Sequence, residues 1–130
     1  MNDLTLSPIG VLHCDLKNRQ NTPKNFTESH YEGTIEIYPQ FLAGLEGIHK
    51  GDTITVLFWL DRADRSVLKV HPRGDTSKPK RGVFSTRSPV RPNPIAVSEL
   101  LVLDVDGNIL TVEGLDILDA TPVIDIKNKI

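Results

Sequence analysis

Ile95–Leu115 reads IAVSELLVLDVDGNILTVEGL, and this stretch indicates the fold more strongly than any other part of the chain. Two runs rich in apolar and β-branched residues flank the tripeptide Asp106-Gly107-Asn108. A turn of this composition between two such runs is typical of a β-hairpin. We therefore predict two antiparallel strands here, joined by a tight turn.

Further runs with the alternation or the β-branched content of strands lie on both sides of this hairpin. They are Leu4–Cys14, Gly33–Pro39, Asp52–Leu60, Ser66–Pro72 and Pro122–Ile126. Asp52–Leu60 is nearly continuous in apolar residues, which predicts a strand buried on both faces. Ser66–Pro72 follows it after a short charged turn and is predicted to be its hairpin partner.

Helical structure is predicted to be short. In Gln40–Ile48 the residues Leu42, Leu45 and Ile48 share one helical face, but glycines interrupt the segment. The chain has no internal repeat, and no helical periodicity in it extends beyond about two turns. About seven short strands separated by turns favour a mostly β protein, folded as a small antiparallel β-barrel or sandwich with short helical turns.

The length and composition of the chain narrow its class. At 130 residues it can build one core but not two, so residues 1–130 are predicted to form a single domain. The lone Cys14 excludes an internal disulfide and suits a reducing compartment. The N-terminus has no secretory signal, and no segment reaches the roughly 20 apolar residues of a membrane span. We therefore expect a cytoplasmic protein without a membrane partner.

Charge is distributed unevenly along the chain. Residues 62–91 contain nine Lys or Arg and two Asp, a net charge of +7, whereas the whole chain carries −2. A basic middle in an acidic protein indicates a local site for an anion, of which nucleic acid is one example. The alternative is a solvated basic loop without a partner.

The basic region ends in an unusual loop, RGVFSTRSPVRPNPIAVS, at Arg81–Ser98. Proline restricts its own backbone and that of the preceding residue, so three prolines in six residues predict a stiff, extended loop. Such a loop can hold the guanidinium groups of Arg87 and Arg91 toward an anionic or planar ligand at little entropic cost. A rigid surface connection with solvated arginines is the alternative.

Three carboxylates, Asp116, Asp119 and Asp125, surround the last predicted strand. They could face water, or bind a cation, a ribose diol or an ammonium group. The four histidines have no metal-ligand spacing and there is one cysteine, so we expect no metal site. Walker and Rossmann phosphate loops and a nucleophile elbow are also absent from the sequence.

Two long segments, GVFSTRSPVRPNPIAVSELL and VEGLDILDATPVIDIK, resemble the motifs of the TsaA-like family of TrmO-type tRNA methyltransferases. The segments PIGVLHC and EGIHKGDTITVLFWLDR resemble the same family, so the similarity covers nearly the whole chain. The resemblance implies a seven-stranded antiparallel barrel, often dimeric, that binds S-adenosylmethionine without a Rossmann fold. It also implies methylation of the exocyclic N6 of threonylcarbamoyladenosine beside the tRNA anticodon.

The resemblance implies roles for individual residues. Arg87 and Arg91 could meet the cofactor carboxylate, whereas Asp116 and Asp119 could meet its ammonium and ribose groups. Arg87 and Asn93 are expected to organise the pocket as often as they touch the ligand. The implied cofactor contacts are Pro23, Lys24, Asn25, Asp61, Arg62, Arg87, Asn93, Val97, Asp116, Asp119 and Thr121. Because the acceptor nitrogen still carries a proton, a general base would help, and Asp119 or Asp61 could serve; a structural hydrogen-bonding role is the alternative for either. The residues expected to bind tRNA are Arg73, Lys78, Lys80, Arg81 and Arg91.

The sequence departs from the family pattern at two glycines, where Ala96 and Ala120 stand instead. If those positions need a positive φ or a close approach of the cofactor, alanine would strain the backbone or narrow the pocket. Three functions therefore stay open. They are tRNA methylation, methylation of another acceptor, and a non-catalytic barrel that binds S-adenosylmethionine, another small molecule or nucleic acid.

Overall fold

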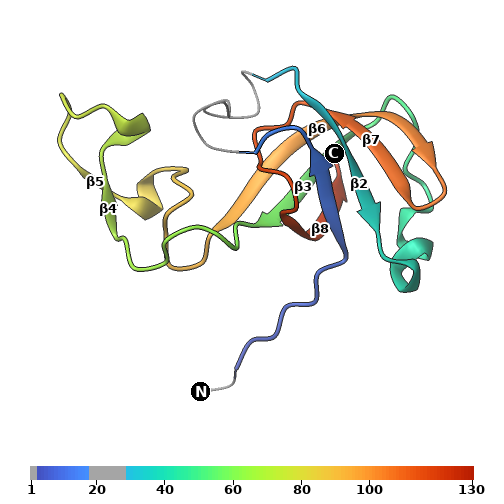
Figure 1. The fold of residues 1–130 in the computed structure, drawn as a ribbon, viewed down its shortest axis with the longest axis horizontal. Coiled ribbons are helices and arrows are strands. Elements are labelled where there is room, and N and C mark those ends of the chain that lie inside the picture. Colours follow the sequence, from blue (N-terminus) through green and yellow to red (C-terminus); the bar gives the residue numbers. More distant parts are fainter. Residues whose placement is uncertain (1–2, 18–28) are drawn as a thin grey trace.

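The computed structural model describes residues 3–17 and 29–130, and in this part of the chain the main feature is a closed antiparallel β-barrel (Figure 1). Its strands follow one another around the barrel in the order β1-β2-β7-β6-β3-β8. Their bounds are Gly10–Cys14 (β1), Glu32–Ile37 (β2), Thr53–Trp59 (β3), Ile95–Asp106 (β6), Ile109–Glu113 (β7) and Pro122–Asn128 (β8). The predicted mostly β barrel is confirmed.

The remaining described elements are short and lie outside the barrel sheet. Strands β4 (Lys69–Val70) and β5 (Arg81–Gly82) form a separate two-stranded sheet. Three short 3₁₀ helices complete the described part of the fold, namely η3 (Pro39–Leu45), η4 (Pro72–Gly74) and η5 (Val83–Ser85). The strand count thus differs slightly from the expected seven, with six strands in the barrel and two beside it. No helix among the described residues has the length and hydropathy needed to cross a membrane.

The hairpin predicted from the DGN turn is present as β6 and β7. Gly107 has a φ of +59°, a left-handed conformation that glycine adopts without steric cost. The Asn108 side-chain amide donates a hydrogen bond to the Ile37 carbonyl at 2.9 Å, and the Ile37 backbone N–H donates to the Asn108 carbonyl at 2.8 Å. These two bonds fasten the turn to the end of β2.

Strand β3 is not buried on both faces, so that prediction is wrong. Ile54, Val56 and Phe58 are fully buried, whereas the residues between them are only half-buried. A closed barrel has one interior, and the outward face of a strand is covered only where other segments pack on it. The outward-facing residues of β3 are half-buried under such segments, which accounts for the high apolar content of the strand.

The barrel interior is filled by side chains from all six strands. The buried cluster contains Leu12, Ile35, Ile37, Ile54, Val56, Phe58, Leu100, Val102, Leu110, Val112 and Val123. Small barrels are packed in this way and leave room for a ligand only at their ends or outside. A binding site must therefore be sought at the barrel's rim.

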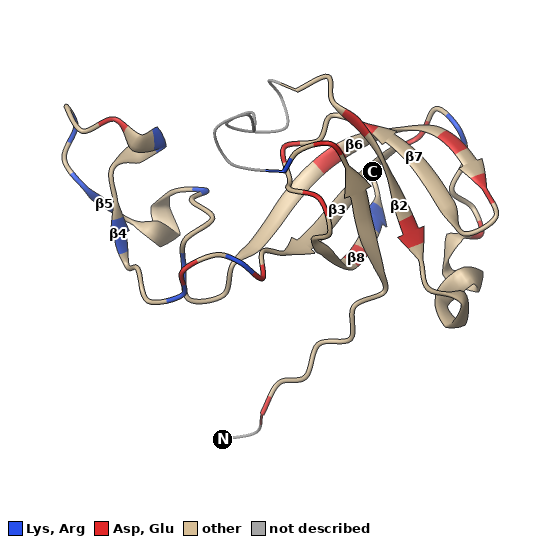
Figure 2. Ribbon diagram, in the orientation of Figure 1, with Lys and Arg blue, Asp and Glu red and all other residues tan. Residues whose placement is uncertain are grey.

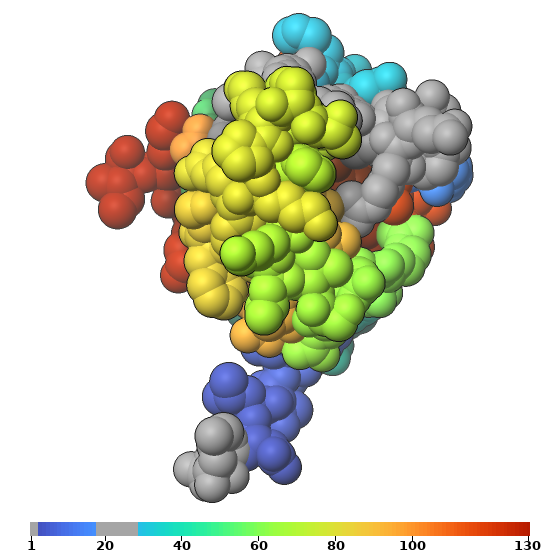
Figure 3. Space-filling view, turned by 90° about the vertical axis from the view of Figure 1, so that its left-hand side faces the viewer, coloured from blue at the N-terminus to red at the C-terminus, as the bar shows by residue number. Residues whose placement is uncertain are grey.

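Residues 61–94, called the arm below, leave the barrel after β3 and return to it at β6. The arm extends to one side of the barrel in Figure 1, and Figure 3 shows it in front of the barrel when seen from that side. The prediction that Ser66–Pro72 pairs with Asp52–Leu60 is wrong, because β6 and β8 occupy both edges of β3. Within the arm, β4 pairs with β5 instead.

Ala120, one of the two alanines at family glycine positions, has a φ of +66°. A side chain in this left-handed region costs about 1 kcal/mol or more. We expect Ala120→Gly to raise the free energy of unfolding by about 1 kcal/mol, reduced slightly by the entropy that glycine adds to the unfolded chain. Urea denaturation followed by circular dichroism measures this change.

Ala96 is the matched control, because it lies inside β6 and is not among the described residues with positive φ. Glycine inside a strand lowers stability. We therefore expect Ala96→Gly to destabilise the protein while Ala120→Gly stabilises it. Equal effects of the two substitutions would contradict this account of Ala120.

Candidate functional site

A pocket of about 570 Å³ lies between the arm and the adjoining end of the barrel. We call it the arm pocket. The arm supplies residues 61–63, 70–74, 81 and 86–89 to its wall, and the barrel side supplies residues 60, 96, 116–118 and 121. The pocket thus forms where the chain leaves β3, enters β6 and approaches β8.

The arm pocket brings together residues that are far apart in the sequence. Of the residues predicted to contact the cofactor, those lining it are Asp61, Arg62, Arg87, Asp116 and Thr121. Two of the residues predicted to bind tRNA, Arg73 and Arg81, line it as well. The pocket wall therefore carries four arginines and two carboxylates over an otherwise largely apolar lining.

Arg87 and Asp116 set the electrostatics of the pocket. The Arg87 guanidinium donates a hydrogen bond to the Val97 carbonyl at 3.0 Å, which ties the stiff loop to β6. The buried Ser98 hydroxyl donates to Asp116 Oδ1 at 3.0 Å. Burial raises the pKa of Asp116, and this effect outweighs the lowering by Ser98 and by the positive charge of Arg87. A half-buried carboxylate and a guanidinium group thus share one wall.

Arg62 joins the arm to the segment before β8. Its Nη2 donates to the Asp119 carbonyl at 2.7 Å and to the Thr121 hydroxyl at 2.9 Å, and its Nε lies 3.6 Å from Asp61 Oδ1. Thr121 is buried, with 1% of its surface exposed. These contacts hold the first residues of the arm against the barrel and define one edge of the pocket.

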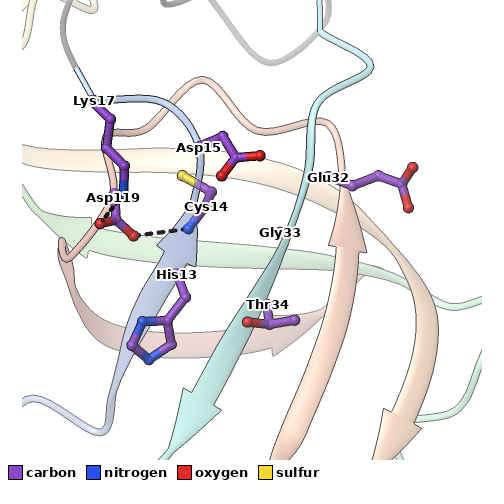
Figure 4. A pocket seen from close by; sticks show the side chains of 8 residues that line it. All are labelled: His13, Cys14, Asp15, Lys17, Glu32, Gly33, Thr34 and Asp119. Carbon is purple, nitrogen blue, oxygen red and sulfur yellow. Dashed lines mark hydrogen bonds and ion pairs between the residues drawn. The ribbon is translucent and has the colours of Figure 1, made fainter.

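Asp119 does not line the arm pocket, and its carboxylate lies instead in a second concavity of about 480 Å³ beside β1 and β2 (Figure 4). Its Oδ1 accepts a hydrogen bond from the Cys14 backbone N–H at 2.9 Å, and its Oδ2 pairs with Lys17 Nζ at 2.6 Å. The bonds from Lys17 and Cys14 lower the pKa of Asp119. Asp119 therefore reaches the arm pocket only through its backbone, by way of Arg62.

Asn93 and Arg91 both make hydrogen bonds that hold the Pro-rich loop, Asn93 to Arg65 outside it and Arg91 to carbonyls within it. Asn93 Oδ1 accepts a hydrogen bond from Arg65 Nη2 at 3.2 Å, and the Arg65 guanidinium lies over the Trp59 ring, 5.1 Å from its centroid. Arg91 Nη1 donates to the Thr86 carbonyl at 3.2 Å and to that of Ser88 at 3.0 Å. These two residues shape the loop that carries Arg87, and neither lines the arm pocket.

The other predicted site residues lie elsewhere. Val97 is 41% exposed on β6, and its carbonyl is the acceptor for Arg87. Lys78 and Lys80 are exposed on the arm. Pro23, Lys24 and Asn25 lie outside the described residues.

Sequence reasoning missed His71 and two apolar residues of the pocket wall, Leu60 and Val70. The apolar lining includes Leu60, Val70, Ala96, Ile117 and Leu118. The sequence presents His71 only as one of four histidines without metal-ligand spacing, and the described residues contain no group of three or more potential metal ligands. The signal that could have singled it out is its position directly before Pro72, where a strand opens into the basic loop.

We expect Asp116→Asn to keep or raise stability at pH 7 while weakening ligand binding. The raised pKa means that ionised Asp116 opposes folding above this pKa, and asparagine removes that charge. This gain in stability should shrink as the pH falls toward 3.8, the ordinary pKa of an aspartate, because wild-type Asp116 then becomes protonated and is uncharged like asparagine. Thermal unfolding at several pH values measures this difference. A loss of stability at pH 7 would contradict the interpretation.

Comparisons with known proteins agree with the motifs and the fold. The model of the family described as "tRNA-methyltransferase O N-terminal domain" matches residues 11–130. A crystal structure of TrmO from Pseudomonas aeruginosa is similar with a TM-score of 0.78 and 27% identity, over 99% of this chain and 57% of that one. Another TrmO crystal structure gives a TM-score of 0.80 and 29% identity, and this chain covers 56% of it.

Two archaeal relatives are similar over most of their length. A probable S-adenosyl-L-methionine-binding protein of Methanothermobacter thermautotrophicus is 44% identical over 96% of this chain and 89% of its own. An S-adenosyl-L-methionine-binding protein of Archaeoglobus fulgidus is 43% identical over 95% and 88%. The resemblance to the TsaA-like, TrmO-type proteins is confirmed, and the chain belongs to the tRNA-methyltransferase O N-terminal domain family.

Proposed function

We propose that this chain binds S-adenosylmethionine in the arm pocket and transfers its methyl group to tRNA. The acceptor we propose is N6 of threonylcarbamoyladenosine next to the anticodon. The observation that carries the proposal is the convergence of Asp61, Arg62, Arg87, Asp116 and Thr121 on one pocket, because the family resemblance implies these same residues as cofactor contacts. The family match and the names of the archaeal relatives support it.

The chemistry of the pocket fits this cofactor. Arg87 offers a guanidinium group for a carboxylate, and Asp116 offers a half-buried carboxylate for an ammonium or ribose hydroxyl group. The apolar lining from Leu60, Val70 and Ile117 suits an adenine ring. When bound, S-adenosylmethionine supplies a methyl group on a positively charged sulfur. The protein's main task is then to hold the acceptor nitrogen in line with that methyl group.

The charge distribution supports tRNA as the acceptor. Figure 2 shows basic residues on β4, β5 and the loops of the arm, while acidic residues are spread over the barrel. The exposed Lys78 and Lys80 lie on the same arm as Arg73 and Arg81 of the pocket. Lysine and arginine contacts to phosphates make binding strongly salt-dependent. We propose that the arm holds the tRNA backbone beside the pocket.

Transfer of a labelled methyl group tests this function. Purified protein, S-adenosylmethionine with a labelled methyl group and tRNA carrying threonylcarbamoyladenosine should yield N6-methylated threonylcarbamoyladenosine on nucleoside mass spectrometry. The same tRNA lacking the threonylcarbamoyl group is the control and should stay unlabelled. Label in both tRNAs would move the acceptor to another nucleotide, and label in neither would refute tRNA methylation.

The second candidate is a barrel that binds the cofactor or nucleic acid without catalysis. The alanines at two family glycine positions favour it, because Ala120 is held at a positive φ and Ala96 lines the pocket. Salt-dependent tRNA binding without methyl transfer would select this candidate. The expectations of a homodimer and of a cytoplasmic location remain predictions, and sedimentation velocity tests the first.

A further inference from the structure

His71 lines the arm pocket from the arm side, directly after β4. It is half-buried, and its Nδ1 lies 2.9 Å from the Lys78 carbonyl oxygen. The loop that contains this carbonyl is held by its own hydrogen bonds, including the Asp75 N–H to the Pro72 carbonyl at 2.9 Å and the Lys78 N–H to the Asp75 carbonyl at 3.2 Å. The imidazole ring is therefore fixed by a structured loop.

The partner of Nδ1 determines which ring nitrogen carries the proton. A backbone carbonyl only accepts hydrogen bonds, so a bond to it requires a proton on Nδ1. In the neutral ring Nε2 is then unprotonated and keeps its lone pair. A bond from Nδ1–H to a backbone carbonyl is one of the common ways in which proteins leave Nε2 of a histidine free to accept a proton.

We propose that His71 is the general base of the methyl transfer, an inference that rests on the proposed function. The acceptor nitrogen forms a bond to the methyl carbon, and the sulfur keeps the electron pair of the broken carbon–sulfur bond. The acceptor N–H proton moves to Nε2 of His71. The positive charge that leaves the sulfonium thus appears on the imidazolium ring of His71.

The two carboxylates predicted as bases are less well placed. Asp119 directs both oxygens to Cys14 and Lys17 in the other concavity. Asp61 lines the pocket, but its carboxylate is paired with the Arg62 guanidinium at 3.6 Å. Histidine is the side chain that exchanges a proton most readily near neutral pH. His71 combines this property with a position in the pocket wall.

His71→Asn tests the role, because the asparagine amide can still donate to the Lys78 carbonyl but offers no base. A general base contributes about 10²-fold or more, so we expect kcat to fall about 100-fold while KM and S-adenosylmethionine binding change less than about threefold. Added imidazole should restore part of the activity of His71→Ala. His49→Asn, at an exposed position outside both concavities, should keep wild-type kinetics.

Long-range ¹H–¹⁵N spectra of wild-type protein with labelled histidine give a readout independent of activity and of how the variants fold. We expect His71 with a proton on Nδ1 and an Nε2 resonance that shifts when S-adenosylhomocysteine is added. A proton on Nε2 instead, or wild-type kcat in His71→Asn, overturns the role of His71 alone. Wild-type protein that makes no methylated product refutes the proposed function itself, and the catalytic role with it.

Discussion

Arg87→Ala is expected to weaken S-adenosylmethionine binding about 30-fold, which corresponds to about 2 kcal/mol. A charge-assisted hydrogen bond to a carboxylate is worth this much in a partly buried site. The substitution also removes the bond from Arg87 to the Val97 carbonyl, which fastens the loop over the pocket. Isothermal titration calorimetry of the wild-type protein and of Arg87→Ala measures the ratio of their dissociation constants for S-adenosylmethionine.

Arg87→Lys separates the contribution of the positive charge from that of the paired hydrogen bonds, because lysine keeps the charge but cannot make two parallel bonds to a carboxylate. We expect an intermediate loss of affinity. Lys129→Ala is the control, since Lys129 is exposed near the C-terminus and pairs with Glu99 at 3.5 Å. Unchanged S-adenosylmethionine binding in Arg87→Ala would contradict the proposed contact between Arg87 and the cofactor carboxylate, even if the protein still methylates tRNA.

Phe58→Ala is expected to lower the free energy of unfolding by about 4 kcal/mol. Phe58 lies on β3, is 0% exposed and belongs to the cluster that fills the barrel. Truncation removes most of its buried apolar surface and leaves a cavity that a closed barrel cannot easily collapse. Urea denaturation monitored by Trp59 fluorescence and by circular dichroism measures the loss.

Phe84→Ala is the matched control for this experiment. Phe84 lies in η5 on the arm and is 78% exposed, so its truncation should change the free energy of unfolding by less than about 0.5 kcal/mol. A loss of several kcal/mol in Phe84→Ala would show that its ring is covered in solution, for example by a second copy of the chain. A small loss in Phe58→Ala would contradict the packing of the barrel interior.

Local sequence patterns predicted the parts of the fold that depend on local chemistry. The DGN turn predicted the β6–β7 hairpin because a two-residue turn requires specific backbone conformations there. The partner of Ser66–Pro72 could not be predicted in this way. Strand pairing depends on which edges are free, and β6 and β8 occupy both edges of β3.

The sequence predicted those site residues that belong to a long motif. It could not predict residues whose role depends on the direction of the side chain in the folded protein. Arg87 and Asp116 come from long motifs, and the structure places both in the arm pocket. Asp119 belongs to the same motif as Asp116, yet its side chain turns to the opposite side of the segment toward Lys17. His71 has no motif of its own, and only the approach of the Lys78 carbonyl makes its Nε2 a candidate base.

The most direct test of the central claim is a crystal structure of this protein with S-adenosylhomocysteine bound. We expect the ligand in the arm pocket, with its carboxylate at Arg87 and its ribose or ammonium group at Asp116. A ligand bound instead in the concavity that contains His13, Lys17 and Asp119 would contradict the assignment of the site.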